Sequence, residues 1–591
     1  MRMGRLLVSI GWDIGPLVFL AYVVVNITTF VGPFLFALGL RPLVNGIFEH
    51  SNGSAALGAA MCSVALLLAV ASPAAYRWTT IRLRERSIMV MQRRLLILST
   101  SAPSLDHFER PQFFDRLQLL KRSSYELVMG MTIATVGPVI LVQLVATSIV
   151  LARLQPLLLL LPFIAVPATW IHQRAEKMRR AGEERAAPKR RNAEHLFILS
   201  ASAPSAMEIR IYDLRDELLR RHRDAGAAAQ HEMETALFRS VALSASGWLL
   251  FAASYVGSVL LVLRGAGTGR VTPGDVALTM GMATAMVTAA GRLTELAGSA
   301  MRAATAADHY HWLEQQVTAP FGRHVDGARL PVPSRLTRGL ELDGVTFSYG
   351  DGDRPALDDV TLRLDAGRVV AVVGENGAGK TTLVKLLCRM YAPTRGRVLV
   401  DGVDLDDLDP AEYRRRVTAG FQDYMRFELL ARETVGVGDA PRLAEVGAVQ
   451  SALTKANGEF VERLPDGVET QLGRSWGGGV ELSGGEWQKL ALARTMMRDD
   501  PFLVVFDEPT ASLDPQTEHA LFEQVASDMR SAAANGRITL LISHRFSTVR
   551  MADVIVVLDR GRVVDQGTHD ELMALGGLYS ELYTLQARAY R

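Results

Sequence analysis

The sequence predicts a multidomain protein in which a six-helix all-α transmembrane domain with long cytoplasmic helix extensions precedes an α/β domain of the phosphate-loop type. Three observations predict this fold. A length of 591 residues with 49% hydrophobic content is more than one soluble domain accounts for. Apolar stretches long enough to cross a ~30 Å hydrocarbon core recur before residue 300. A G-x-x-x-x-G-K-T motif begins at Gly374. We therefore expect a transmembrane domain over residues 1–317, a linker over 318–338 and a nucleotide-binding domain over 339–591.

Six apolar stretches mark the expected membrane spans. They lie near residues 17–40, 55–76, 127–151, 157–171, 241–263 and 276–297. Ionisable residues are nearly absent from these stretches, which argues against a proton relay or an ion path at mid-membrane depth. A hydrophobic or amphipathic cargo fits such spans better. Met280, Met282 and Met286 in the last span either form an adaptable apolar wall, since thioethers repack around different shapes, or simply pack against lipid and neighbouring helices.

Arginine-rich connections between the spans predict the orientation of the chain. Residues 77–126 and 172–240 are dense in Arg and Lys, so both connections and both termini are expected on the cytoplasmic side. Both connections also show helical periodicity, which predicts helix extensions that turn once near Pro111–Asp115 and Arg210–Leu214. The alternative is a merely solvated charged face. Because the basic excess lies beside apolar spans, an anionic membrane surface is a better partner for it than nucleic acid.

The phosphate-loop motif lies in the context that it needs. Residues 368–373 indicate a buried strand and residues 383–390 a helix. The glycines let backbone N–H groups turn inward on a phosphate chain, and the helix N-terminus adds its partial positive charge. Lys380 would reach the β- and γ-phosphates, and Thr381 would offer its hydroxyl to Mg²⁺. The alternative is a Gly-rich turn that only connects strand and helix. The predicted ATP-binding residues of the loop are Gly374, Glu375, Asn376, Gly377, Ala378, Gly379, Lys380, Thr381 and Thr382.

Further candidates for phosphate chemistry follow other predicted strands. Asp507 and Glu508 end the apolar run 501–506, which allows Asp507 to hold Mg²⁺ and Glu508 to deprotonate the water that attacks the γ-phosphate. His544 follows another apolar strand and is expected on the γ-phosphate side. The amide of Gln422 is expected to contact both the metal and the water. The predicted catalytic residues are therefore Glu508, His544 and Gln422, and the predicted metal-binding residues are Thr381, Gln422 and Asp507.

Two further elements complete the predicted nucleotide site. Tyr349 lies shortly upstream of the phosphate loop, and its ring either stacks on a purine or is an ordinary tyrosine of a sheet. Ser483, Gly484 and Gly485 open a helix within Leu482–Gln488. Their backbone predicts a second anion-binding nest, so we include them among the ATP-binding residues.

Together these motifs resemble the ATP-binding cassette family over residues 340–586. The residues named above match its base-stacking aromatic, phosphate loop, glutamine loop, signature, acid pair and histidine, and Ser512-Leu-Asp514 matches a further family element. Six spans ahead of one cassette resemble a half-size exporter, so the resemblance covers nearly the whole chain. It implies ATP and Mg²⁺ as cofactors, and a role for Asp514 in coupling between cassettes.

The same resemblance implies how the chain assembles. It implies a homodimer, or a heterodimer with a similar half-transporter, and a multi-pass protein of the bacterial cell (inner) membrane. The two cassettes of such a dimer would face head to tail, so each ATP would lie between the phosphate loop of one chain and Ser483–Gly485 of the other. The tips near Phe113 and Tyr212 would then carry cassette closure to the spans.

Two features depart from the commonest exporter pattern. The longer loop Gly473–Val480 stands where many exporters carry a Glu-containing loop before the signature, so no cross-talk acid is assigned. Trp487 in the signature, together with Arg432–Asp439, resembles the bacterial branch that exports ribosomally made peptides such as lantibiotics. No peptidase domain precedes the first span, so we do not expect the chain to cleave a leader peptide.

The predicted function is ATP-driven efflux of an amphipathic or hydrophobic molecule, such as a peptide, a lipid or a drug-like compound. ATP-induced dimerisation of the nucleotide-binding domains would drive alternating access. Import through the same exporter-like fold is one alternative, which the direction of transport in inside-out vesicles decides. A non-transport ATPase that acts on DNA or ribosomes is the other, and it would fractionate as a soluble protein. The expected partners are a second copy or a similar chain, membrane lipid and the cargo, with no nucleic acid.

Overall fold

The computed structural model describes residues 12, 15–102, 104–202, 205–266, 271–318, 329–350, 354–508, 535–543 and 545–589. The chain forms two compact units. The helical unit comprises Met1–Thr100 and Asp115–Glu314, and the nucleotide unit comprises Ser101–Phe114 and Gln315–Arg591. A short stretch from the N-terminal half, Ser101–Phe114, therefore folds with the nucleotide unit. We call it the inserted segment.

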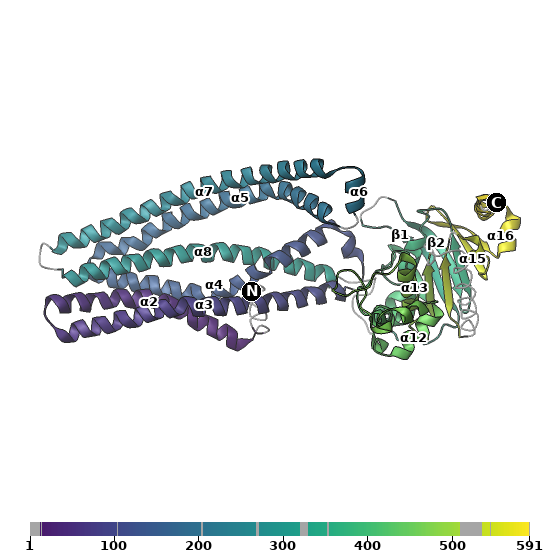
Figure 1. The fold of residues 1–591 in the computed structure, drawn as a ribbon, viewed down its shortest axis with the longest axis horizontal. Coiled ribbons are helices and arrows are strands. Elements are labelled where there is room, and N and C mark those ends of the chain that lie inside the picture. The colour runs from purple at the N-terminus through teal and green to yellow at the C-terminus, as the bar shows by residue number, and fades with distance from the viewer. Residues whose placement is uncertain are drawn as a thin grey trace. The chain divides into compact units, whose positions relative to one another are not determined.

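Six long helices build the described part of the helical unit (Figure 1). They are α2 Pro16–Phe48, α3 Asn52–Ser101, α4 Pro111–Leu154, α5 Leu161–Ala201, α7 Arg215–Ala266 and α8 Pro273–Val317. Between them lie the short helix α6, Ala206–Ile211, and the 3-10 turns Asp106–Glu109 and Pro156–Leu160. Among the described residues, helices α2, α3, α4, α7 and α8 are long and apolar enough to cross a membrane. The side chains of the predicted span 157–171 lie mostly outside the described part of the chain.

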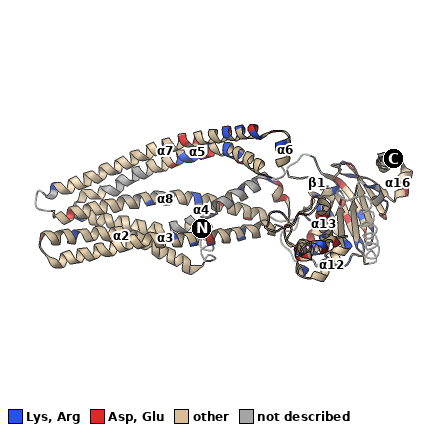
Figure 2. Ribbon diagram, in the orientation of Figure 1, with Lys and Arg blue, Asp and Glu red and all other residues tan. Residues whose placement is uncertain are grey.

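Helices α5 and α7 run side by side (Figure 1). Gly182 of α5 permits this approach, because a Cβ built there would lie 2.1 Å from the Cβ of Ala236 on α7. Lys189 Nζ of α5 also pairs with Glu232 Oε1 of α7 at 3.1 Å. Among the described residues of the two helices, Lys, Arg, Asp and Glu gather toward the ends that adjoin α6 (Figure 2). This distribution agrees with an apolar span that continues into a polar helix extension.

A buried apolar cluster joins α2, α4, α7 and α8. Its members are Ala37, Leu151, Leu158, Val262, Leu278, Met282 and Met286. Arg41 Nε of α2 contacts Asp275 Oδ1 of α8 at 2.7 Å nearby. Met282 and Met286 are almost fully buried and hold helices together, whereas Met280 is 45% exposed. Of the three methionines, only Met280 therefore remains a candidate for the predicted apolar wall.

In the described part of the nucleotide unit, ten strands form two sheets. The antiparallel sheet has the order β2-β1-β4-β5, and the second sheet has the order β10-β9-β3-β8-β7-β6. The strands are β1 Gly339–Phe347, β2 Leu357–Asp365, β3 Val369–Val373, β4 Arg395–Val400, β5 Val403–Asp404, β6 Val417–Gly420, β7 Leu503–Asp507, β8 Ile538–Ile542, β9 Val554–Asp559 and β10 Arg562–Gly567. Strands β9, β3, β8, β7 and β6 are parallel. Their carboxyl ends therefore meet at one edge.

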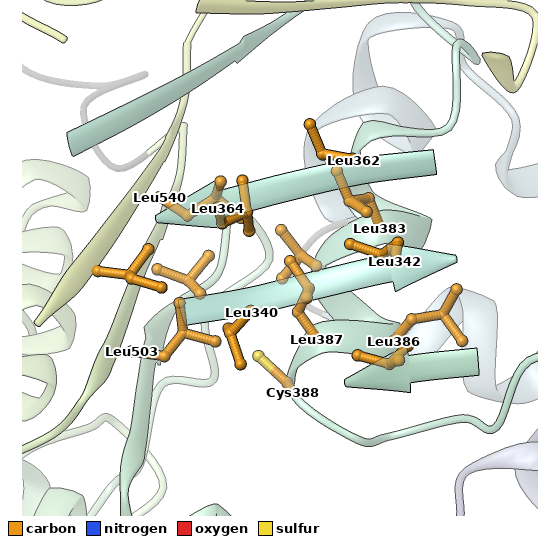
Figure 3. Packing of buried hydrophobic residues seen from close by; sticks show 14 of the residues in the cluster. Leu340, Leu342, Leu362, Leu364, Leu383, Leu386, Leu387, Cys388, Leu503 and Leu540 are labelled. Atoms are coloured by element: carbon orange, nitrogen blue, oxygen red, sulfur yellow. The ribbon is translucent and has the colours of Figure 1, made fainter. Parts of the chain in front are cut away.

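Helices cover the second sheet. They are α9 Lys380–Leu387, α10 Pro410–Arg415, α11 Ala431–Gly436, α12 Val446–Lys455, α13 Gly484–Thr495, α15 Phe546–Val549, α16 His569–Leu575 and α17 Leu578–Ala589. Side chains alternate along β3, with Val370 and Val372 in one core and Val369, Ala371 and Val373 in another. Figure 3 shows the first core, in which leucines of β1 and β2 meet leucines of α9 and of the parallel strands. A strand that is buried on both faces is typical of a parallel sheet with both sides covered.

The predicted tips of the helix extensions differ in how closely they match the structure. The chain turns at the 3-10 helix Asp106–Glu109, and Pro111 begins α4. The first turn therefore lies just before the predicted stretch Pro111–Asp115, because proline suits the first position of a helix rather than its end. The second predicted tip, Arg210–Leu214, covers the end of α6 and the turn that leads into α7.

Candidate functional site

The phosphate loop joins β3 to α9. Gly374, Gly377 and Gly379 have φ values of +155°, +84° and +103°, a region that side chains strongly disfavour. A Cβ at Gly374 would also lie 2.1 Å from the carbonyl oxygen of Leu558. Gly379 is the N-cap of α9, so the amides of the first helical turn have no partner within the helix. This backbone is suited to hold an anion.

Lys380 folds back over the same loop. Its Nζ donates to the carbonyl oxygens of Gly374 at 2.8 Å and Glu375 at 3.0 Å. Burial lowers the pKa of the Lys380 ammonium, and the charges of Glu508 and Asp507 act in the opposite direction. The acids thus help to keep the buried Lys380 ammonium charged beside the loop.

Asp507 and Glu508 lie at the end of β7. Asp507 is 2% exposed, and the nearby hydroxyl of Thr381 acts to lower the pKa of its carboxyl group. Burial, together with the charge of Glu508, raises the pKa of Asp507. Glu508 has a φ of +49°, and its N–H donates to the carbonyl oxygen of Ile542 at 3.0 Å. A left-handed residue other than glycine costs roughly 1–3 kcal/mol and is concentrated at functional sites.

Gln422 follows the neighbouring strand at the same edge. Gly420 of β6 pairs with Phe506 of β7, and Gln422 comes two residues later, where its side chain is exposed. The described part of the edge therefore carries the phosphate loop, the two acids and Gln422. His544 and Asp514 lie outside the described residues.

Tyr349 lies beside the first turn of α9. Its hydroxyl and that of Thr382 are hydrogen-bonded at 3.1 Å. The ring packs edge-on against Phe347 and Tyr391, with centroid distances of 4.9 and 5.4 Å, and Lys385 Nζ lies 5.1 Å from its centroid. The Tyr349 ring thus lies at the start of the helix that follows the phosphate loop, and its stacking on a base stays a prediction.

The signature residues form the start of α13. Ser483 is the N-cap, and its Oγ contacts Glu486 N at 3.3 Å and Glu486 Oε2 at 2.8 Å. This capping box fixes the helix start. Ser483 and Gly484 are exposed, and a Cβ built at Gly484 would have no atom within 4 Å among the described residues. Trp487 is buried under them. The helix start is therefore rigid and open to an incoming group.

The loop Gly473–Val480 is closed and anchored. Gly473 N donates to Val480 O at 2.9 Å. The exposed Trp476 donates through Nε1 to the carbonyl oxygen of Glu428 at 2.9 Å. Glu428 lies six residues beyond Gln422. The indole of Trp476, and not a carboxylate, therefore links the loop Gly473–Val480 to the segment that follows Gln422.

A pocket of about 640 Å³ opens beside the phosphate loop. It is lined by Val373, Gly374, Glu375, Asn376, Ser543, Leu582, Leu585 and Gln586. Leu582, Leu585 and Gln586 belong to α17, a helix that none of the sequence motifs connects with the site. An amphipathic C-terminal helix carries no local signal for such a position.

A second pocket, of about 500 Å³, lies between helices of the helical unit. Its lining comes from α2, α3, α7 and α8 and consists of Gly32, Pro33, Phe36, Ala65, Leu66, Ala69, Tyr255, Met280, Gly281, Thr284, Ala285 and Thr288. These residues lie within the expected spans, and no acid or base is among them. Such a lining is suited to an apolar group.

Comparison with known proteins extends these observations. Residues 357–511 match the family model described as ABC transporter. The chain is similar to an ATP-dependent lipid A-core flippase of Chromohalobacter salexigens, with 34% identity over 360 residues that cover 60% of this chain and 59% of that protein. A flippase of the same name from Ralstonia nicotianae is 40% identical over 299 residues, which cover 50% of this chain and 48% of that protein. The chain thus spans about half the length of the curated relatives it matches.

A solved structure shares the whole fold. The bacterial Atm1-family ABC exporter with ATP bound has a TM-score of 0.81 over 96% of this chain and 98% of that chain, at 23% identity. The predicted fold class, a helical membrane domain followed by an α/β nucleotide-binding domain, is therefore confirmed.

Proposed function

We propose that this chain, whose residues 357–511 match the ABC transporter family model and whose fold is that of an Atm1-family ABC exporter, hydrolyses ATP to move a lipid-like amphipathic molecule across the bacterial cell membrane. The observation that carries the proposal is the combination, in one chain, of a phosphate loop, the buried Asp507 with the adjacent Glu508, and five helices able to cross a membrane. A hydrolytic site without such helices would fit a soluble ATPase equally well.

The chemistry of the site follows from positioning and charge. The loop amides and Lys380 would hold the β- and γ-phosphates. Thr381 and Asp507 offer a hydroxyl and a carboxylate close to each other, and such oxygen ligands suit Mg²⁺, which when bound offsets phosphate charge. Glu508 would accept the proton of the attacking water, and Gln422 and His544 would orient the water and the γ-phosphate.

The site is proposed to be completed by a second copy of the chain. The open start of α13, from Ser483 to Gly485, would bind the γ-phosphate held by the phosphate loop of the partner, with Asp514 coupling the two sites. Bound ATP would then hold the two cassettes together, and its hydrolysis would let them separate. Because ATP binds the closed pair more tightly, binding itself shifts the spans between two states.

The pocket lined by Met280 supports an apolar cargo. Its walls carry hydroxyls of Tyr255, Thr284 and Thr288 but no charge, so they suit a hydrocarbon portion rather than a charged headgroup. The relatives named lipid A-core flippase support a lipid over a peptide. We propose outward movement, with the arginine-rich extensions and both termini on the cytoplasmic side of the inner membrane.

Transport by the purified homodimer in inside-out vesicles tests this function. We expect Mg²⁺-ATP to move a fluorescent phospholipid from the outer to the inner leaflet, because the cytoplasmic face is outside. The Glu508→Gln variant should bind ATP but not sustain movement. Movement in the opposite direction would assign import, and ATP hydrolysis without movement of lipid, peptide or dye would remove the transport assignment. A labelled amphipathic peptide in parallel vesicles separates the lipid class from the peptide class.

A further inference from the structure

An aromatic cluster contains Tyr349, the expected base-binding ring, and extends to the inserted segment. Phe347, Tyr349 and Tyr391 pack mutually, with ring centroids 4.9 to 5.4 Å apart. Tyr391 is 3% exposed and lies just beyond α9. Lys385 of α9 places its ammonium 5.1 Å from the ring centroid of Tyr349 and 5.7 Å from that of Tyr391. One cation thus faces both rings and ties their positions to α9.

The far end of Tyr391 contacts the inserted segment. Its hydroxyl donates a hydrogen bond to Glu109 Oε1. The adjacent residue, Met390, accepts a hydrogen bond through its carbonyl oxygen from Leu105 N at 3.0 Å. Burial and the Glu109 carboxylate raise the pKa of the Tyr391 phenol, so it remains a protonated donor at neutral pH. A neutral donor to a carboxylate makes a strong, directional bond.

These contacts form a continuous path. Thr382 of the phosphate-loop helix bonds Tyr349, the Tyr349 ring packs on Tyr391, and Tyr391 bonds Glu109. The inserted segment connects α3 directly to α4, and both helices contain expected spans. Edge-to-face packing depends on ring angle, so a base that stacks on Tyr349 would restrict the orientation of Tyr391 as well.

We propose that Tyr391 is a positioning residue through which base stacking on Tyr349 fixes the inserted segment. This inference rests on the proposed ATP site. It goes beyond that site because it assigns the adenine, and not only the phosphates, a role in holding the connection between α3 and α4. A phosphate chain without a base would occupy the phosphate loop but would not slow amide exchange in the inserted segment.

Hydrogen–deuterium exchange of the inserted segment tests the inference. The experiment uses the full-length homodimer in lipid nanodiscs in the Glu508→Gln background, so that ATP is not consumed. We expect Mg²⁺-ATP to slow exchange in Ser101–Phe114, and Mg²⁺-tripolyphosphate to leave it close to that of the free protein. In Tyr391→Phe, the rings still pack but the bond to Glu109 is lost. Exchange should rise about tenfold, as expected for one hydrogen bond to a charged group, and the ATP response should disappear.

Matched variants separate loss of the Tyr391–Glu109 hydrogen bond from a general destabilisation of the inserted segment. Glu109→Gln keeps an acceptor and should retain most of the ATP response, whereas Glu109→Ala should behave as Tyr391→Phe does, and their combination should add little. Ser104→Ala is the control, because Ser104 Oγ donates to Asp106 Oδ2 at 2.6 Å within the segment. It should keep the full response.

The outcomes distinguish this inference from the proposed function. A normal ATP response in Tyr391→Phe, or an equal response to tripolyphosphate and ATP, overturns the role of Tyr391 and leaves the ATP site intact. Loss of the response in Ser104→Ala as well would assign the effect to the segment as a whole and overturn the specific path. Failure of the parent protein to bind ATP would overturn both proposals.

Discussion

The hydroxyl of Thr381 lies close enough to the carboxylate of Asp507 to oppose the rise in its pKa, which places the phosphate loop next to the end of β7. Sequence motifs far apart in the chain assigned both residues to Mg²⁺, and the fold brings their side chains close together. Asp507 is buried, and its pKa is raised. A buried carboxylate needs a compensating cation in order to stay ionised, so Lys380 and a bound metal ion are its natural partners.

Replacing Lys380 by alanine should abolish ATP binding at working concentrations. The ammonium would supply charge-assisted bonds to the phosphates, and loss of such bonds weakens binding roughly 10- to 100-fold or more. Equilibrium binding of a fluorescent ATP analogue to the purified protein measures the effect. Lys455→Ala, at the end of α12, is a control that removes the same charge away from the loop. Unchanged affinity in Lys380→Ala would contradict the assignment of the loop.

Two inactive variants should complement each other in a mixed dimer. Lys380→Ala disables a phosphate loop, and Ser483→Arg blocks the open start of α13. In a head-to-tail pair, one of the two composite sites then keeps both an intact loop and an intact signature. Dimers purified through two different tags should trap about half the ATP of the wild type, while each variant alone traps none. No trapping in the mixed dimer would exclude sites shared between chains.

His107 predicts a pH dependence of the inserted segment. Its ring is 6% exposed and packs against Phe108 and Phe113 at centroid distances of 4.1 and 4.7 Å. Burial lowers the pKa of His107 below its ordinary value of about 6.5. The unfolded segment therefore binds the proton more tightly, so the stabilisation is complete above the ordinary pKa and is lost as the pH falls below it.

Exchange of the segment at pH 7.5 and 5.5, corrected for the intrinsic rates, measures this effect. We expect the protection to fall at pH 5.5 in the wild type and to stay nearly constant in His107→Phe, which keeps an aromatic ring but cannot be protonated. His195→Asn changes an exposed histidine of α5 and should behave as the wild type does. An equal loss of protection in His107→Phe would assign the pH dependence to another group.

Local signals made the fold class and the nucleotide motifs predictable. Apolar stretches longer than a bilayer core and a strand-loop-helix motif need no knowledge of distant contacts, and the fold confirms the architecture that they predicted. The position of the inserted segment was not predictable in this way. Tyr391 and Glu109 are 282 positions apart, and neither residue type is unusual in its local sequence.

The three methionines of the last span also show that local sequence signals do not predict contacts between helices. Met280, Met282 and Met286 were equal candidates for an apolar wall, since all three lie in one apolar stretch. The packing of α2, α4 and α7 buries two of them and leaves Met280 at a pocket. Helical periodicity predicts that residues differ in the faces they occupy, but not which face meets a neighbouring helix.

Replacing Glu508 by glutamine should separate ATP binding from hydrolysis. Glutamine keeps the size and hydrogen-bonding reach of the side chain and adopts the same left-handed backbone conformation. It cannot accept the proton of the attacking water. General-base assistance is typically worth ~10² to 10⁴ in rate, which corresponds to roughly 3 to 5.5 kcal/mol of barrier. The ATPase rate should fall by this factor while the affinity for ATP is kept. Glu459→Gln, which changes an exposed residue at the start of the turn Glu459–Arg463, is the matched control and should hydrolyse ATP at the normal rate.

The same variant tests whether binding alone closes the cassettes. If ATP favours the closed pair, Glu508→Gln should accumulate with two ATP molecules held between its cassettes, because the step that releases them is blocked. Spin labels on the two cassettes, with and without Mg²⁺-ATP, should report a shorter distance with ATP, together with spans that leave the inward-open form. Hydrolysis near the wild-type rate would move the base role to another group, with His544 the first candidate. Cassettes that stay apart with ATP bound would show that ATP binding is not what drives the spans.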